Sequence, residues 1–539
     1  MTRLFRSSLL AVLAAAPLGA QQPAAGAAPA APAVAGCNID FNQPKELVTV
    51  YNIGRPRAIQ LQAGDERGKA ILGVLKAVNN PKLAAANPQA SAVLTGEMLV
   101  LWMMQPGVGA TTTRGSLALA GDAAATIDLA RMADSLFTSI EASNPSCKGD
   151  LKIWREAKPW QDRINGAFKA LAASQFDSAE VLAKSSMVLD RTSPYAHRVL
   201  AAVAQSRKKE GEMLQHLGAA LALTAGDTAY LDDRRAVQFQ IGQIALEYAE
   251  TQPEPARTQI LRQAVDAMVA LATESPAAEA TPYALSGLGM AAMSLKDTTL
   301  FLKCFSMVDG AVDKYSDLSS LQAAVCAHRA GKIPDAVRMF QATMAKNPNS
   351  RDALYNAAAL MYDLRKGAEM LPVVTKLVEI DPSNPDNISL FAYAYNVLNE
   401  QSKPTTTLAP AKPAPGAKPA KPAKPATPVP AAPPVPAAPK NTWVDSVAKY
   451  MKISDDMPVR LTIVEFNRYA DRATLRGEVE NRSKVAKAYE VEFEFLDLAG
   501  AVLEKQVAKV ESTAPGKAGT FSLTVTKPKV AAWRYAPIK

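Results

Sequence analysis

A segment near the middle of the chain repeats itself at a spacing of about 34 residues, and this spacing constrains the fold more than any other feature. Small residues recur at that spacing as Ala324, Ala358 and Ala392, and Gly289 stands nearly one spacing before the first of them. A second set of positions recurs in the same way: Ala336, Phe340 and Thr343, then Met370, Val374 and Leu377. One amphipathic hairpin cannot bury its own apolar face, so repeats of this length stack on one another. The spacing therefore predicts a mainly α, helical-hairpin solenoid.

With Pro348 and Pro382 closing successive units, the repeat resembles the tetratricopeptide repeat family. Weaker copies occur upstream, at Ala179, Ala183 and Ser186, then at Met213, Leu217 and Ala220. At ordinary helix lengths we expect roughly six or seven hairpins in the range 160–400. The resemblance implies a superhelix that binds a peptide or protein on its concave side. First-helix residues Asn356, Tyr362 and Tyr395 are the candidate contacts, and packing within the repeats is the alternative role for the aromatic rings.

Beyond Pro458 the apolar period changes from helical to alternating. In "YEVEFEF" the residues Tyr489, Val491, Phe493 and Phe495 alternate with glutamates, which is the pattern of a half-buried strand. Further alternating runs predict roughly six or seven short strands and a small all-β, immunoglobulin-like sandwich. The glutamates are interpreted as the solvated face of a strand and not as a calcium site.

This part of the chain, residues 459–539, resembles the FxLYD family of small exported bacterial β domains. The resemblance is carried by "GEVENRS" and "FEFLD" and by four later residues: Gly500, Pro515, Gly516 and Phe521. Phe495 and Leu496 replace the Leu and Tyr of the family. The resemblance implies an accessory or adhesion-like binding role and brings no catalytic residue.

The first residues have the character of a secretory signal peptide, since Arg3 and Arg6 precede a short apolar run that ends at Ala20. We expect residues 1–20 to be removed, residues 21–36 to be disordered, and the protein to be exported to the periplasm or cell envelope. The alternative is that "VAGC" resembles a lipobox in which Cys37 is acylated, the one case in which membrane association is expected. No transmembrane segment is expected, because the later run "ASAVLTGEMLVLWMM" is short, contains a glutamate and fits a buried helix.

The chain has four cysteines, which in an oxidising compartment allow three pairings into two disulfides. Cys304 and Cys326 would lie on consecutive helices, so a bridge between them is sterically feasible. Two buried free thiols are the alternative, and the spacing alone does not choose between them.

The net charge of +9 does not indicate a nucleic-acid partner. Residues 401–440 contain six lysines and no acidic residue, and Arg3 and Arg6 belong to the expected signal peptide. The helical body is therefore close to neutral, whereas phosphate neutralisation requires a clustered basic patch.

The chain shows no residue pattern typical of catalysis, of a cofactor or of a metal. The stretch "GLGMAA" matches a dinucleotide fingerprint only formally, because it lies within a helical repeat, where glycines serve close helix packing. His197, His216 and His328 each stand alone on a predicted helix, with no second imidazole at ligand spacing. We therefore expect that the protein is not an enzyme and that it binds no cofactor. The alternative is an enzyme site in residues 37–160, which would require perturbed titratable groups converging in a pocket.

Residues 401–440 consist mainly of Ala, Pro and Lys, which favours an extended low-complexity segment. The helix expected at 441–458 places Ser446, Tyr450 and Ile453 at the second-helix positions of a repeat. The Ala/Pro/Lys segment is thus either a linker between domains or a loop inserted in the last hairpin.

The predicted organisation is a helical region at 37–160, repeats at 161–400, the low-complexity segment, the helix at 441–458 and the sandwich at 459–539. The leading functional hypothesis is an exported, non-catalytic scaffold of the bacterial cell envelope that binds an envelope protein or peptide. A lipid-anchored subunit of envelope assembly is the alternative within the same compartment.

Overall fold

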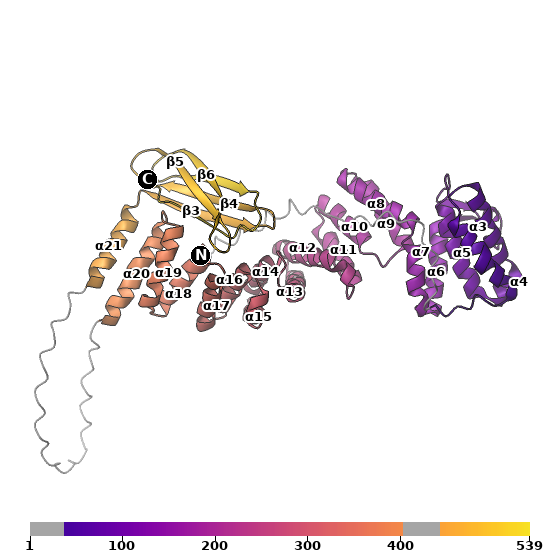
Figure 1. Cartoon of the computed structure of the whole chain (residues 1–539), viewed down its shortest axis with the longest axis horizontal. Helices are drawn as coiled ribbons and strands as arrows, with labels where there is room; N and C mark the ends of the chain where they lie inside the picture. The colour runs from indigo at the N-terminus through magenta and orange to yellow at the C-terminus, as the bar shows by residue number, and fades with distance from the viewer. Residues whose placement is uncertain (1–36, 403–441, 539) are drawn as a thin grey trace, which may run out of the picture. The chain divides into compact units, whose positions relative to one another are not determined.

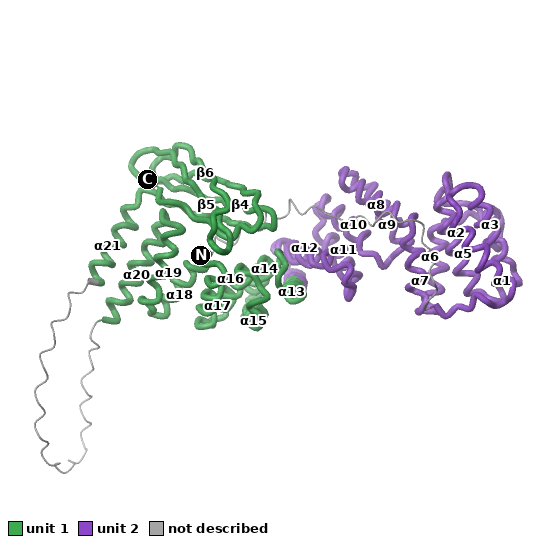
Figure 2. Tube along the Cα trace, in the orientation of Figure 1, with its two compact units in different colours: residues 1–14, 268–539 green, residues 15–267 purple. Residues whose placement is uncertain are grey.

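A computed structural model describes residues 37–402 and 442–538. They belong to two compact units (Figure 2), an N-terminal unit that ends at residue 267 and a C-terminal unit that begins at residue 268. The expectations for residues 1–36 and for the low-complexity segment fall almost wholly outside the described residues. Within the described part, none of the helices combines the length and the apolar character needed to cross a membrane.

The N-terminal unit begins with a globular helical region that does not follow the repeat. Its helices are α1 (Lys45–Thr49), α2 (Arg55–Gln60), α3 (Asp65–Val78), α4 (Pro81–Ala86), α5 (Pro88–Met103), α6 (Leu129–Ser143) and α7 (Lys148–Arg155). A short antiparallel hairpin, β1 (Thr111–Thr113) with β2 (Thr126–Asp128), connects α5 to α6 and has no counterpart in the sequence expectations. The apolar run with a glutamate forms α5 and is buried along most of its length, as predicted.

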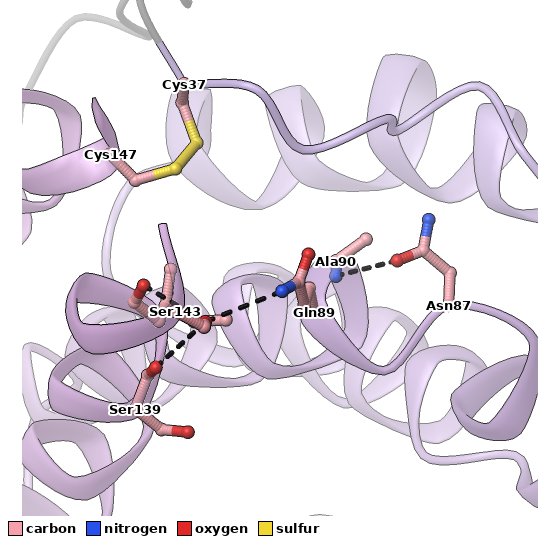
Figure 3. The surroundings of a disulfide bond; sticks show 8 residues. Cys37, Asn87, Gln89, Ala90, Ser139, Ser143 and Cys147 are labelled. Carbon is pink, nitrogen blue, oxygen red and sulfur yellow. Dashed lines mark hydrogen bonds between the residues drawn. A yellow bond between two sulfur atoms is a disulfide. The ribbon is translucent and has the colours of Figure 1, made fainter. Parts of the chain in front are cut away.

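A disulfide between Cys37 and Cys147 joins the start of this region to the residues before α7 (Figure 3). Nearby, Asn87 caps α5 by accepting a hydrogen bond from the Ala90 N–H at 3.0 Å, which satisfies one of the unpaired donors of a helix start. Gln89 donates to the Ser143 hydroxyl at 3.5 Å and so ties α5 to α6. The sulfur of Cys37 is engaged in the disulfide, so this structure has no thiol there for the lipid attachment considered as the alternative.

Helical hairpins complete the N-terminal unit. They are α8 (Lys158–Ala172) with α9 (Phe176–Leu189) and α10 (Tyr195–Ser206) with α11 (Glu210–Leu223), followed by α12 (Leu231–Glu250) and by α13 (Ala256–Glu274), which crosses the unit boundary. The six upstream positions predicted to pack are all buried: Ala179, Ala183, Ser186, Met213, Leu217 and Ala220.

The C-terminal unit continues with paired helices (Figure 1). These are α14 (Thr281–Leu295), α15 (Thr298–Asp309), α16 (Asp317–Arg329), α17 (Ile333–Lys346), α18 (Arg351–Asp363), α19 (Gly367–Ile380), α20 (Pro385–Ser402) and α21 (Thr442–Asp456). The positions that recur once in every repeat are buried between these helices: Ala324, Ala336, Phe340, Thr343, Ala358, Met370, Val374, Leu377 and Ala392. The chain's own spacing and packing therefore establish a tetratricopeptide-like helical repeat.

Helix α21 lies against α20, as the second-helix interpretation requires. Phe391 of α20 stacks on Tyr450 with 4.7 Å between ring centroids, and Tyr395 stacks on Trp443 at 5.6 Å. The pairing is antiparallel, because the later residue of α20 meets the earlier residue of α21. Ser402 and Thr442, where the described chain stops and resumes, consequently lie at the same end of one hairpin.

The predicted register of α21 is wrong at its last position. Ile453 is 42% exposed, whereas the neighbouring Ser454 is buried and its hydroxyl lies 2.9 Å from that of Ser389 in α20. The buried face of α21 thus follows a spacing of four residues after Tyr450, where the clearest repeat unit has a spacing of three.

The last strands form the predicted sandwich. They are β3 (Val459–Arg468), β4 (Ala473–Asn481), β5 (Lys487–Leu496), β6 (Val502–Thr513), β7 (Ala518–Val525) and β8 (Ala532–Tyr535). Two antiparallel three-stranded sheets result, in the orders β3-β4-β7 and β6-β5-β8. The alternating residues of β5 are buried on one face, and on the other face Glu490 and Glu494 pair with Lys509 and Lys505 of β6.

Several residues that carry the FxLYD resemblance have packing roles in the sandwich. A Cβ on Gly477 would lie 2.5 Å from the ring of Phe521, so only glycine fits between β4 and β7. The amide of Asn481 donates to the carbonyl oxygens of Val485 and Thr513 at 2.8 and 2.7 Å.

Candidate functional site

The sandwich docks on the turns that connect successive hairpins of the C-terminal unit. The Tyr535 hydroxyl of β8 donates to the Asp381 carboxylate at 2.5 Å and accepts from the Ser383 N–H at 3.0 Å. The N–H of Leu461 in β3 donates to the Ser383 carbonyl at 2.9 Å. Burial, together with the negative charge of Asp381, raises the pKa of Tyr535 well above its usual value, so the hydroxyl remains a donor.

Earlier repeats also hold the sandwich, through a turn residue and through the first turns of α14 and α16. Asn347 stands one repeat before Asp381 and donates to the carbonyl of Ala531 at 3.1 Å. Arg468, at the end of β3, pairs with Asp317 at 2.7 Å, and its carbonyl accepts from the Tyr283 hydroxyl at 3.0 Å. Burial raises the pKa of Tyr283 to about 12. One edge of the repeat array is therefore occupied by the chain's own β domain.

The first helices of the same repeats present a second, partly exposed surface, which we call the first-helix face. Its residues recur at the repeat spacing and are intermediate or exposed: Gln322 and Asn356, then Val325, Ala359 and Tyr393, then His328, Tyr362 and Asn396. The docking contacts described above involve none of these side chains. The first-helix face is the candidate binding surface.

Two of the three predicted contact residues lie on this face. Among the residues that the structure describes, the amide of Asn356 donates only within its own helix, to the Asp352 carbonyl at 2.8 Å. Tyr362 faces Tyr393 of the next first helix, with 5.4 Å between ring centroids. Tyr393 is 42% exposed and was not among the residues predicted from the sequence. It stands two repeats after Val325, so the repeat spacing could have indicated its place on this face.

The third predicted residue, Tyr395, belongs elsewhere. Its ring stacks on Trp443 and Tyr450 of α21, and it stands one repeat after the buried Met361. Tyr395 therefore packs the last hairpin, which is the alternative role considered for it, and Tyr393 takes its place on the first-helix face.

A pocket opens on the first-helix face between α14 and α16. Its apolar lining includes Leu285, Gly289 and Phe301 and the sulfur-bearing Cys326. Cys326 is disulfide-bonded to Cys304, which joins α16 to α15. The glycines of "GLGMAA" thus lie inside the helix α14, as expected. Gly289, however, borders a pocket and does not serve a close contact between helices, because a Cβ there would meet only the Cys326 sulfur, at 3.7 Å.

The N-terminal region contains the kind of titratable cluster that an enzyme site would need. Glu97 is buried in α5, and burial raises its pKa. Both of its carboxylate oxygens accept from Arg55, at 2.5 and 3.0 Å, and the Arg55 guanidinium lies over the rings of Tyr51 and Trp154. Since the carboxylate is fully engaged, this cluster is interpreted as a structural ion pair.

Two histidines lie together in the structure, which corrects the interpretation that each stands alone. Nδ1 of His197 in α10 is 3.3 Å from Nδ1 of His216 in α11. Burial lowers the pKa of both imidazoles, and the charge of His216 adds to the effect on His197. Within residues 37–402 and 442–538, no three His, Cys, Asp or Glu side chains form a group suited to a metal ion.

Comparison with known proteins identifies no relative by sequence: no family model and no curated protein matches the chain. Among solved structures, one from a study of Pseudomonas aeruginosa pilF matches with 13% identity over 41% of this chain and 90% of that chain, with a TM-score of 0.26. The TPR2AB domain of yeast Sti1, solved with pHSP90, matches with 15% identity over 44% of this chain and 98% of that chain, with a TM-score of 0.20. The TPR domain of P58(IPK) matches with 14% identity over 63% of this chain and 88% of that chain, with a TM-score of 0.20. At these values no functional argument rests on the matches.

Proposed function

We propose that the protein is an exported, non-catalytic scaffold of the bacterial cell envelope that binds a peptide or protein on the first-helix face. The observation that carries the proposal is that different residues of the C-terminal unit contact the β domain and form the first-helix face. The β domain is held by turns between the hairpins and by residues at the starts of α14 and α16. Further along the first helices, recurring side chains such as Tyr362 and Tyr393 take no part in these docking contacts. Solenoids use such continuous surfaces for binding extended partners.

Export is supported by the cysteines. All four are paired, as Cys37–Cys147 and Cys304–Cys326, and such bonds persist mainly in oxidising compartments. The signal-like first residues and the FxLYD resemblance of the sandwich favour the same compartment. Intact mass of the mature protein tests this part: cleavage after Ala20 is expected, and a diacylated Cys37 as the first residue would instead establish the lipid-anchored alternative.

The binding function is tested by capture from an envelope fraction with three baits. The wild-type chain is expected to retain specific proteins, and the double variant Tyr362→Ser/Tyr393→Ser is expected to lose them. Leu302→Ser serves as the control, because this residue is also exposed in the C-terminal unit but lies on α15, a second helix. Equal capture by all three baits, or none above background, would refute the proposal.

A further inference from the structure

Residues 403–441, which we call the Pro/Lys segment, are attached next to the first-helix face. They connect Ser402, at the end of α20, to Thr442, at the start of α21. Because each repeat consists of two antiparallel helices, the first helices α16, α18 and α20 run in the same direction. Tyr362 and His328 each stand one residue before the end of a first helix, so they lie toward the same end of the helices as Ser402.

The Pro/Lys segment is long enough to reach these residues and to return. It consists of 39 residues. A proline-rich chain extends by about 3.1 Å per residue, so a segment of this length can run outward by about 60 Å and come back. Adjacent helices pack about 8–10 Å apart, so both α18 and α16 lie within that reach of α20.

The composition of the segment fits the side chains of the first-helix face. Thirteen of its residues are proline, six are lysine, and none is aromatic or acidic. Proline-rich chains dock in grooves lined by aromatic rings, and their backbone carbonyls, which lack internal partners, accept hydrogen bonds from polar donors. The first-helix face offers the rings of Tyr362 and Tyr393 and the amide of Asn356. Burial lowers the pKa of His328, so the side chains that define this face are uncharged at neutral pH.

We propose that the Pro/Lys segment occupies the first-helix face of its own chain, with prolines against Tyr362 and Tyr393, and that a partner must displace it. The inference rests on the proposed function, because segment and partner share one surface. A segment tethered this closely has an effective concentration on the order of 1 mM, so even a weak contact competes with a partner at a lower concentration. The lysines remain in water, since the face has no charge to pair with them.

The test follows a fluorescently labelled peptide of residues 403–441 by fluorescence anisotropy. Its receptor is the otherwise complete chain in which those residues are replaced by a Gly/Ser sequence of equal length, which keeps α20 connected to α21. The wild-type chain is expected to bind the peptide at least about tenfold more weakly than this Gly/Ser variant, because its own segment competes. Adding Tyr362→Ser/Tyr393→Ser to the Gly/Ser variant is also expected to weaken binding at least about tenfold.

Matched controls separate recognition of proline from charge and from folding. Leu302→Ser in the Gly/Ser variant is expected to leave the affinity unchanged, since this exposed residue lies on α15, a second helix. A peptide with all its prolines replaced by serine is expected not to bind. A peptide with its six lysines replaced by glutamine is expected to bind within about threefold of the original, because proline and not lysine contacts the face.

Three results would each overturn the inference: no binding of the peptide to the Gly/Ser variant, equal binding to the wild-type chain, or equal binding after Tyr362→Ser/Tyr393→Ser. Sedimentation of the wild-type chain adds a fourth. A dimer that the Gly/Ser variant does not form would show that the segment of one copy binds a second copy, which would refute its assignment to its own chain.

Capture from the envelope fraction distinguishes this inference from the proposed function. If the peptide does not bind but the Gly/Ser variant and the wild-type chain capture the same proteins equally, only the inference is refuted. If the peptide binds as expected and neither chain captures a protein, the proposed function fails and the segment remains the occupant of the face. Both hold if the Gly/Ser variant captures the same proteins in larger amounts than the wild-type chain.

Discussion

The two units stabilise their helices by different means. The N-terminal region has a non-repeating core, in which one disulfide joins residues 110 apart and a buried Arg55–Glu97 pair lies inside. The C-terminal unit has a repeat array, in which each hairpin contacts its neighbours, and its disulfide spans only 22 residues. There the long-range links come from the sandwich, whose contacts reach Asp317 and Asp381 in different repeats. A repeat array with only local contacts therefore gains its long-range connection from an added domain.

The largest expected effect comes from removing the long-range disulfide. Cys37→Ser/Cys147→Ser should lower the free energy of unfolding by about 5 kcal/mol, because the unfolded chain regains the entropy of a long loop. Cys304→Ser/Cys326→Ser, which opens the shorter loop, should cost about 3 kcal/mol. Denaturant unfolding followed by tryptophan fluorescence measures both. An equal or larger loss for the shorter loop would contradict the comparison.

Removing one member of the buried ion pair should have the next largest effect. Arg55→Met leaves the Glu97 carboxylate buried without its partner and should cost about 3–5 kcal/mol in urea unfolding. Arg55→Met/Glu97→Met should recover most of this loss. Lys69→Met is the control, since its partner Glu66 is exposed and the change should stay within about 0.5 kcal/mol. A loss in the double variant equal to that in Arg55→Met would show that packing, and not charge, is responsible.

Tyr535 tests the docking of the sandwich. Tyr535→Phe removes the hydrogen bonds to Asp381 and Ser383 and should destabilise the C-terminal unit by about 1.5–3 kcal/mol, because one bond is to a charged group. Tyr489→Phe is the matched control, since that buried hydroxyl has no hydrogen-bond partner among the described residues. Thermal unfolding of both variants is the measurement, and a comparable loss in Tyr489→Phe would argue against a specific docking bond.

The histidine pair should give the smallest effect. The pKa values of His197 and His216 are lowered by burial, so the unfolded chain binds protons more readily than the folded hairpin. Stability should therefore fall as the pH drops from about 7 to 5, through the usual histidine range. Glu212, Glu180 and Lys184 also act on His216 electrostatically and modulate the fall.

His216→Gln should make the pH dependence of the unfolding free energy shallower. His328→Gln is the control, because burial also lowers the pKa of His328 but the structure pairs it with no second imidazole. If His328→Gln flattened the profile more than His216→Gln, the contact between His197 and His216 would not be its source.

The regular part of the fold was predictable because a repeat position packs against its neighbours in the same way in every unit. Ala358 and Met370 could thus be placed in the interior from spacing alone, and β5 from its alternation. Departures from the repeat were not predictable in this way. The last turn of α21 buries Ser454, whereas the repeat spacing favoured Ile453. At this point α21 faces the first turns of α20, where the small residue Ser389 contacts Ser454.

The candidate site was predictable only in part. Spacing placed Asn356 and Tyr362 on the first-helix face. It could not show that the ring of Tyr395 stacks on α21, since these aromatic partners lie beyond the low-complexity segment. Contacts between distant residues leave no local pattern: Tyr535 and Asp381 are 154 residues apart, and His197 and His216 meet across antiparallel helices. The pocket at Gly289 was missed because a glycine in a helix has the same sequence signature whether it permits close packing or leaves space.

The geometry of the last hairpin makes it a convenient place for protein engineering. The chain leaves α20 at Ser402 and returns at Thr442, so a reporter domain with adjacent termini could replace the intervening residues without separating the two helices. Only Met457 and Pro458 stand between α21 and β3. The inserted domain would therefore leave both the packing of α21 on α20 and the attachment of the sandwich in place.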